Sequence, residues 1–425
     1  MIKVRKKYIV FVGGISSLAK STLLEYIEKN NKKWELLILQ DKGKNHIENS
    51  YEIDCQNSET IIKFVSEYGD AILCVTARGE KNIPLFQKII PYLPEHVLTP
   101  TVESLIKATE KTEMRKAFKK FNPKITPKFA ILKTGSKEEI ESKVQKFDFP
   151  ILVKPAGLAQ ARLVQAAYYP NELEQIVRDI NKKMARLYAQ LKGRGEQHIL
   201  IEEIVEGDQF SVDIFIEALG TIHFAPFVRY TTGNQKGFDD FFSYEQTTPA
   251  RISSESVEKA REVISQGVMA LGLKCSSGHV ELIRNKEGEW KIVEIGPRLG
   301  GFRSILYKKS FDIDLDIQDL NVRMGKKIIL PRKKIGYTSF IKFFAKEEGI
   351  IVSMLGTKKA QYLPSFLGID QHLKIGDKAE FAKNGGHAVF VIRLFNKDKK
   401  QFTEDKRKLE KMIHIKTIPK KPKLK

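Results

Sequence analysis

The stretch GHVELIRNKEGEWKIVEIGPRLGG, residues 278–301, predicts a β-hairpin with its turn at residues 285–288. One glutamate lies in each predicted strand, Glu281 in HVELI and Glu294 in IVEIG, and apolar residues flank both. Two carboxylates that face the same way from adjacent strands repel unless a cation lies between them. Mg²⁺ suits such a pair, because it takes one or two carboxylates together with substrate phosphates. Two glutamates that merely point to solvent explain the pattern equally well at this stage.

Arg298 follows the second strand of this hairpin and precedes Gly300 and Gly301. A guanidinium at this place can hold a carboxylate or a phosphoryl group through two hydrogen bonds. The paired glycines allow the backbone to approach a ligand closely. A surface arginine in an ordinary turn is the alternative.

Two lysines are candidates for phosphate binding. Lys154 ends the apolar run ILVKP, and the small-residue loop AGLAQAR that follows it can cover phosphates with backbone N–H groups. Lys111 lies in the preceding helical segment and is a weak candidate by itself. The alternative for both is a surface lysine at the end of an element.

The segment ILIEEIVEGDQFSVDIF, residues 199–215, contains a candidate site for a nucleotide base. An adenine ring needs an apolar slot and backbone hydrogen bonds at a strand edge. Glu202, Glu203 and Val205 can supply that edge. A strand end with solvated carboxylates is the alternative.

Composition sets the outer limits. At ~100–200 residues per domain, 425 residues predict two to four domains of a globular protein. No apolar run approaches the ~18–20 residues of a membrane span, so we expect no membrane partner. The formal net charge is +21, but the lysines are spread along the chain and no nucleic-acid-binding motif accompanies them, so nucleic acid is disfavoured as a partner. The three cysteines, Cys55, Cys74 and Cys275, lack metal-ligand spacing and fit a cytoplasmic protein.

The order of predicted elements divides the chain into three parts. In residues 1–100 strands alternate with helices, which predicts an α/β domain with a small, doubly wound parallel sheet. Residues 101–330 begin with one long predicted helix over 101–121, capped by Thr101, and continue as α+β structure with a helix at 254–272 capped by Ser254. Residues 331–425 predict a small, mixed, strand-rich domain with a basic tail.

These signals, taken in order, resemble the ATP-grasp superfamily of carboxylate–amine ligases. The resemblance covers residues 1–415 and is strongest to members with a biotin-carboxylase-like layout, including amino-acid and dipeptide ligases. It implies a Rossmann-like pre-ATP-grasp domain, a two-lobed ATP-grasp domain and a small C-terminal domain. It also implies ATP bound between two antiparallel sheets, and Mg²⁺, with Mn²⁺ as an alternative.

The resemblance implies a role for each candidate residue. Lys111 and Lys154 match the phosphate-binding lysines, and Glu202, Glu203 and Val205 match the adenine-binding hinge. Glu281 and Glu294 match the magnesium ligands, and Arg298 matches the arginine that stabilises the acyl phosphate. The sequence departs from the family in three places: Gly296 replaces a metal-binding Asn, Gln209 replaces a ribose-binding Glu, and the phosphate loop is poor in Gly and Ser.

The implied activity is ADP-forming ligation of a carboxylate to an amine through an acyl phosphate. The substrates are small molecules, and a homodimer is a reasonable expectation for this layout. Arg229, Gly300, Gly301, Arg303 and the stretch 237–244 are the candidates for substrate contacts. An ATP-grasp carboxylase or nucleotide-pathway ligase is the alternative within the fold, and a non-catalytic ATP-binding module with a basic surface is the alternative outside enzymes.

A near-match to a second phosphate-binding motif, FVGGISSLAKST, covers residues 11–22. A P-loop requires a second glycine where Ala19 stands. We therefore interpret Gly13 and Gly14 as a strand-to-helix turn, with Ser16 or Ser17 as the helix cap and Lys20 on the surface. This turn lies at the edge of the sheet where such folds bind ligands, so it can still border a substrate cleft.

Overall fold

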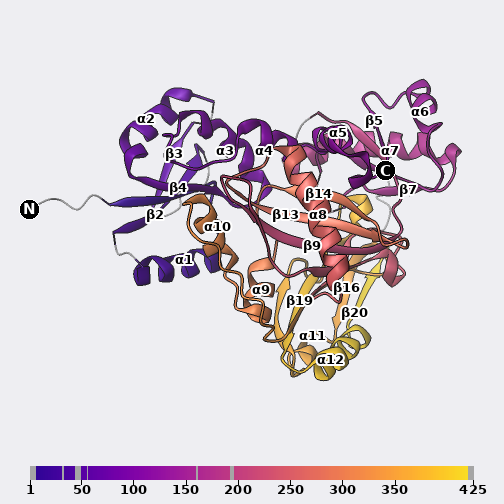
Figure 1. The fold of residues 1–425 in the computed structure, drawn as a ribbon. Coiled ribbons are helices and arrows are strands. Elements are labelled where there is room, and N and C mark those ends of the chain that lie inside the picture. The colour runs from indigo at the N-terminus through magenta and orange to yellow at the C-terminus, as the bar shows by residue number, and fades with distance from the viewer. Residues whose placement is uncertain are drawn as a thin grey trace, which may run out of the picture.

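The computed structural model describes residues 6–30, 33–43, 49–54, 56–158, 161–191 and 196–419. Figure 1 shows the indigo N-terminal part at one side of the molecule and the lobe that carries α6 (Lys137–Val144) and α7 (Pro170–Leu191) at the other. The orange-to-yellow C-terminal part lies below the two. This mixed α/β and α+β architecture agrees with the predicted fold class.

The N-terminal part is a parallel sheet with strand order β3-β2-β1-β4. Its core residues come from both faces of the sheet, because Val10 and Val12 pack in one apolar cluster while Ile9 and Phe11 pack in another. Strands buried on both faces are typical of doubly wound sheets. The elements are β1 (Lys7–Val12), α1 (Ser17–Asn30), β2 (Trp34–Asp41), β3 (Ser50–Ile53), α2 (Ser58–Tyr68), β4 (Ile72–Ala77) and α3 (Ile83–Ile89).

The glycine pair after β1 forms the predicted turn. Gly13 and Gly14 have φ of +81° and +118°, conformations that favour glycine. Ser16 caps the following helix, since its Oγ accepts a hydrogen bond from the N–H of Ala19 at 3.3 Å. Lys20 is half-buried rather than fully exposed.

The single helix predicted over residues 101–121 is wrong. Two helices, α4 (Val102–Thr109) and α5 (Lys111–Phe121), meet at Glu110, whose backbone is extended with φ −99° and ψ 109°. The predicted cap at Thr101 is confirmed, because its hydroxyl accepts the N–H of Ser104 at 3.1 Å. The break makes Lys111 the first residue of α5.

A four-stranded antiparallel sheet, order β5-β8-β6-β7, forms the lobe with α6 and α7. Its strands are β5 (Phe129–Leu132), β6 (Ile151–Pro155), β7 (Gln165–Ala167) and β8 (Ile199–Glu203). Apolar residues of β6 and β8 pack against Val177 and Ile180 of α7. The loop between β6 and β7 is the predicted phosphate loop, and its residues 159 and 160 lie outside the described part of the chain.

The largest sheet has nine strands, in the order β14-β13-β9-β11-β12-β15-β19-β17, with β10 paired to β9. One face is covered by α8 (Ser254–Leu271), which packs Ile264 and Val268 against Phe210 and Ile292. The cap of α8 is Ser253, not the predicted Ser254, since the Ser253 hydroxyl accepts the N–H of Ser256. The strands of the nine-stranded sheet are β9 (Gly207–Ile216), β10 (Ile222–Phe224), β11 (Val228–Thr232), β12 (Ser243–Thr248), β13 (Ser276–Asn285), β14 (Trp290–Gly296), β15 (Tyr337–Phe343), β17 (Phe366–Gln371) and β19 (Phe390–Asn396).

The opposite side of this sheet meets α9 (Arg303–Phe311) and α10 (Leu315–Arg323). Leu306 and Tyr307 of α9 pack with Tyr230 and Phe340 of the sheet. The strands β15, β17 and β19 extend the sheet across residue 330, so the predicted domain boundary there stays a prediction.

The remaining C-terminal elements form a three-stranded sheet, order β18-β16-β20, flanked by two helices. They are β16 (Gly349–Leu355), α11 (Thr357–Ala360), β18 (Lys378–Ala379), α12 (Lys399–Met412) and β20 (His414–Ile418). Much of the predicted basic tail thus belongs to α12 and β20, and residues 420–425 lie outside the described part. Cys74 and Cys275 are buried and free, and Cys55 is not among the described residues.

Candidate active site

The predicted hairpin is confirmed as β13 and β14, and its two glutamates lie opposite one another. The strands pair antiparallel with Glu281 in register with Glu294. Opposed residues on one face of such a pair have Cβ atoms only ~4.5–5.5 Å apart, and like charges there are destabilising. A cation between them would remove that cost.

Both carboxylates have partners that draw them into the protein. Glu281 Oε1 accepts a hydrogen bond from the Tyr230 hydroxyl at 3.3 Å and lies 3.6 Å from His279 Nε2. Glu294 Oε2 lies 3.6 Å from Lys111 Nζ. Burial raises the pKa of Glu281, but His279, Arg298 and Arg303 together hold that pKa below its ordinary value. Glu281 is therefore an anion in the folded protein.

These oxygens fit a Mg²⁺ ion that brings its own phosphate ligands. Within the described ranges, no group of three or more His, Cys, Asp or Glu side chains could hold a metal ion. Mg²⁺ usually keeps water ligands and binds through one or two carboxylates plus substrate phosphates. The opposed glutamates match that donor set, so metal binding by this pair would depend on a bound nucleotide.

A buried charged triad lies beside the glutamates. Glu202 accepts hydrogen bonds from Arg115 Nε at 2.7 Å and from Lys154 Nζ at 2.6 Å, and all three side chains are almost fully buried. Burial alone would raise the pKa of Glu202, but the two cations lower it to about 2. Arg115 also donates to the carbonyl of Val293, the residue before Glu294, at 2.8 Å. No sequence pattern pointed to Arg115, which lies on α5 one turn after Lys111.

Lys111 joins the phosphate loop to the hairpin. Its Nζ donates to the carbonyl of Leu158 at 2.9 Å in addition to its contact with Glu294. The N–H of Gly157 is already bonded to the Tyr188 hydroxyl at 2.6 Å. The structure thus brings Lys111, Lys154, Glu202, Glu281 and Glu294 into one group.

The other hinge candidates flank this group. Glu203 Oε1 accepts the N–H of Lys128 at 3.0 Å and Lys291 Nζ at 2.6 Å. Val205 lies in the connection between β8 and β9. Gln209 shares a face of β9 with Ser211 and Asp213, since alternate residues of a strand point the same way. Their roles toward adenine and ribose stay predictions.

Arg298 lies at the exit of β14 and is held by the N-terminal part of the chain. Its Nη2 is 2.5 Å from Glu80 Oε1, and its Nη1 donates to the carbonyl of Leu299 at 3.2 Å. Burial lowers the pKa of Arg298, but the carboxylates of Glu80, Glu294 and Glu281 raise it above its ordinary value. Arg298 is therefore a fixed cation near both opposed glutamates.

Arg303 and Gly300 have structural partners within the protein. Arg303 is fully buried and donates to Ser211 Oγ at 2.7 Å, the Tyr230 hydroxyl at 2.6 Å and Gln246 Oε1 at 3.0 Å. A Cβ on Gly300 would come within 2.5 Å of His279 Nδ1, so the close approach that this glycine permits is to His279. Gly301 has open space around it, as a position beside a ligand requires.

Arg229 is not brought to this group. It neighbours Tyr230 in β11, and adjacent residues of a strand point to opposite faces. The Tyr230 side chain meets Glu281, so Arg229 lies on the other face, where it pairs with Asp208. Its predicted role in substrate binding gains no support from this arrangement.

Sequence reasoning missed Lys342 and His279. Lys342 of β15 points to the same face as Phe340, whose ring lies 5.0 Å from that of Phe302. Burial lowers the pKa of Lys342 to about 8 against the opposing effect of Glu281, and none of the described residues forms a hydrogen bond or ion pair with its side chain. His279 could have been found by alternation, since it lies two residues before Glu281 on one strand.

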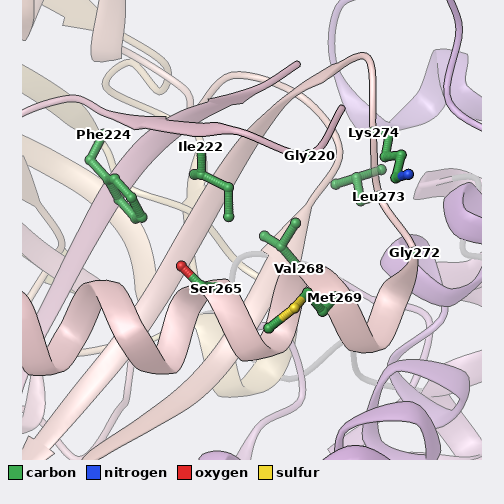
Figure 2. Close-up of a pocket in the computed structure, with 9 residues that line it drawn as sticks. All are labelled: Gly220, Ile222, Phe224, Ser265, Val268, Met269, Gly272, Leu273 and Lys274. Carbon is green, nitrogen blue, oxygen red and sulfur yellow. The ribbon is translucent and has the colours of Figure 1, made fainter. Parts of the chain in front are cut away.

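A separate apolar pocket of about 360 Å³ lies between β10 and the C-terminal end of α8. Figure 2 shows Ile222 and Phe224 of the strand facing Val268 and Met269 of the helix, with Lys274 near the turn beyond it. None of its lining residues is a predicted site residue. Its lining residues include no acid, arginine or histidine.

Comparison with known proteins places the site in a family. Residues 147–305 match the family model of the ATP-grasp domain, and this segment contains Lys154, Glu202, Glu281, Glu294 and Arg298. Residues 147–305 are therefore similar to ATP-grasp domains. The predicted resemblance is thereby confirmed.

Solved structures share the fold of nearly the whole chain. The L-amino acid ligase from Bacillus licheniformis superposes with a TM-score of 0.72 at 16% identity, over 97% of this chain and 99% of that one. The N5-carboxyaminoimidazole ribonucleotide synthetase from Thermotoga maritima superposes with a TM-score of 0.64 at 18% identity, over 97% and 100%. At such identities the likeness concerns the fold alone.

A curated relative matches part of this chain. The D-alanine–D-alanine ligase of Xanthomonas axonopodis pv. citri is 25% identical over 199 residues, which cover 46% of this chain and 58% of that protein. The chain spans about half the length of the curated relatives it matches. No helix among the described residues combines the length and apolarity needed to cross a membrane.

Proposed function

We propose that this protein is an ATP-dependent, ADP-forming ligase that joins a small carboxylate, an amino acid or a similar acid, to an amine. One observation carries the proposal: two opposed carboxylates, Glu281 and Glu294, lie among the cations Lys111, Lys154 and Arg298. Magnesium and the phosphates of ATP would satisfy both sets of charges at once. The ATP-grasp neighbours named as ligases support this assignment.

Activation of the carboxylate is the first task of such a site. A carboxylate is a poor electrophile, and transfer of the γ-phosphoryl group of ATP converts it to an acyl phosphate with a good leaving group. In this proposal, Lys111 and Lys154 neutralise charge on the phosphates. When bound, Mg²⁺ would be held by Glu281 and Glu294 and would neutralise charge on the phosphoryl oxygens.

Attack by the amine is the second task. Nitrogen adds to the acyl carbon, negative charge develops on the carbonyl oxygen, and phosphate departs as the C–N bond is completed. Arg298 can donate hydrogen bonds to that oxygen, and one such donor is worth ~3–4 kcal/mol of transition-state stabilisation in other enzymes. The lobe of β5–β8 contributes Lys154 and Glu202 to the site, and closure of this lobe would keep water from the acyl phosphate.

A pooled-substrate assay tests the proposal. We expect ADP release that requires Mg²⁺, a carboxylate and an amine, with a condensed product found by mass spectrometry of pools of amino acids and small amines. Arg229→Ala is the matched control, because Arg229 lies on the far face of the same sheet. ADP binding with no substrate-dependent turnover in any pool would contradict ligation and favour a non-catalytic module.

A further inference from the structure

We propose that Glu80, in the N-terminal domain, is a positioning residue for Arg298 and completes the active site across the domain boundary. This inference rests on the proposed function, which assigns Arg298 to the reacting carboxyl and phosphoryl groups. Glu80 begins a short 3₁₀-helix, Glu80–Asn82, that follows β4. Neither the motifs nor the family resemblance pointed to this residue.

The contact between the two residues fixes the plane of the guanidinium. Glu80 Oε1 holds Nη2 at 2.5 Å while the Leu299 carbonyl holds Nη1 at 3.2 Å. A guanidinium has five N–H donors in one plane. When both terminal nitrogens are held, the directions of the remaining N–H donors are fixed as well. Without Glu80, one carbonyl contact would remain and the long side chain could rotate.

Gly296 provides the space for this pair. A Cβ at residue 296 would lie 3.6 Å from Arg298 Cζ and 3.7 Å from Glu80 Oε1, so any longer side chain would reach the ion pair. The glycine that departs from the family pattern therefore has a local reason. The absence of a side chain at Gly296 leaves space for the ion pair of Glu80 and Arg298.

The turn that carries Glu80 is itself tightly held. Asn82 is buried and donates to the carbonyl of Arg78 at 2.6 Å, and a Cβ on Gly13 would overlap its side chain at 2.2 Å from Oδ1. Arg78 pairs with Asp316, and the Thr76 hydroxyl donates to Asp319 at 2.6 Å, which joins β4 to α10. The turn at Gly13 and Gly14, which resembles a P-loop in sequence, therefore leaves space for Asn82 and so helps to hold the segment that carries Glu80.

Two variants separate geometry from charge. Glu80→Gln and Glu80→Ala remove the same negative charge, but only Gln keeps an oxygen that can accept from Arg298. If Glu80 positions Arg298, kcat for substrate-dependent ADP release should fall at least tenfold in Glu80→Ala and less than threefold in Glu80→Gln. KM for ATP should stay within twofold in both, and Glu35→Ala, which removes the partner of surface Lys6, should match the wild type.

A binding measurement makes the test independent of turnover. We expect calorimetric titration of inorganic phosphate into the ADP-saturated protein to show affinity at least fivefold weaker in Glu80→Ala than in Glu80→Gln, with equal ADP affinity. Equal phosphate affinity in the two variants, or no phosphate binding by the wild-type ADP complex, would overturn the inference. A wild type that binds phosphate in this way but ligates nothing would overturn only the proposed function.

Discussion

Glu281 and Glu294 form a pair of carboxylates with partners on several elements. Their strands place them opposite one another, and neighbouring cations keep Glu281 ionised. Glu281 has Tyr230 of β11 and His279 of its own strand as partners, and Glu294 has Lys111 of α5. Such a pair favours a divalent cation that arrives with phosphates, which is the basis of the first prediction.

Glu281→Gln and Glu294→Gln should each abolish substrate-dependent ADP release while the protein stays folded. Glutamine keeps the size of the side chain but loses the charge that a magnesium ion requires. Turnover is measured by coupled ADP detection, and folding by circular dichroism and thermal unfolding. Unchanged turnover in both variants would remove the pair from the metal site.

Lys342→Met should raise the thermal midpoint at pH 7. The folded state lowers the pKa of Lys342 to about 8, whereas an unfolded lysine has a pKa of ~10.4. The unfolded chain therefore holds an extra proton between these values, and wild-type stability should rise as pH increases from about 8 to ~10.4. That rise should be smaller in Lys342→Met, as calorimetric scans across this range would show. An equal rise in both proteins would contradict the lowered pKa.

At the scale of elements, the triad of Arg115, Glu202 and Lys154 joins α5, β8 and β6. Glu202 is the shared counter-ion of the two buried cations. Removal of Glu202 would leave both cations unpaired, whereas removal of one cation would leave Glu202 paired with the other. The triad also reaches β14 through the carbonyl of Val293, so it links the β5-β8-β6-β7 sheet to the nine-stranded sheet. Stability and nucleotide binding should therefore respond separately at its three positions.

Glu202→Gln should lower the free energy of unfolding by ~3–5 kcal/mol, because two buried cations lose their counter-ion. Urea denaturation at pH 7 measures the loss. Since the folded pKa of Glu202 is about 2 and the unfolded value is ~4.3, its stabilisation is complete above ~4.3 and disappears as pH falls toward 2. The difference between variant and wild type should shrink over that window, and a constant difference would contradict this account.

Lys154→Met should weaken ATP binding with a smaller effect on stability. Arg115 remains to neutralise Glu202, so no buried charge is left unpaired. The loss of one cation should appear as a higher dissociation constant for ATP in equilibrium titration. An unaltered constant would remove Lys154 from the phosphate site.

At the scale of the whole molecule, the N-terminal part of the chain is joined to the rest through α10. Asp319 accepts the Thr76 hydroxyl and pairs with buried Arg323 Nε at 3.1 Å, while Asp316 pairs with Arg78. In Figure 1, α10 lies between the indigo domain and the rest of the chain. The position of Glu80 at the site depends on this junction.

Asp319→Ala should destabilise this junction by ~3–5 kcal/mol, since Arg323 would be left buried and unpaired. We expect faster proteolysis at the junction and lower kcat, because Glu80 would lose its fixed position. Glu35→Ala, at an exposed ion pair, should change stability by no more than ~1 kcal/mol and serves as the control. If proteolysis at the junction becomes faster but kcat stays equal to that of the wild type, the contact between β4 and α10 does not position Glu80.

The sequence by itself determined the doubly wound N-terminal sheet, the hairpin of Glu281 and Glu294, and the strand that carries Lys154. Each follows from local periodicity and turn chemistry, which a short stretch encodes. The break at Glu110 escaped this reasoning, because helical periodicity continues on both sides of it. Only the tertiary structure decided that Glu80, Arg115 and Lys342 accompany Arg298, Glu202 and Glu281. These partners lie far apart in the chain, and no local pattern records which buried charges meet when separate sheets and helices pack together.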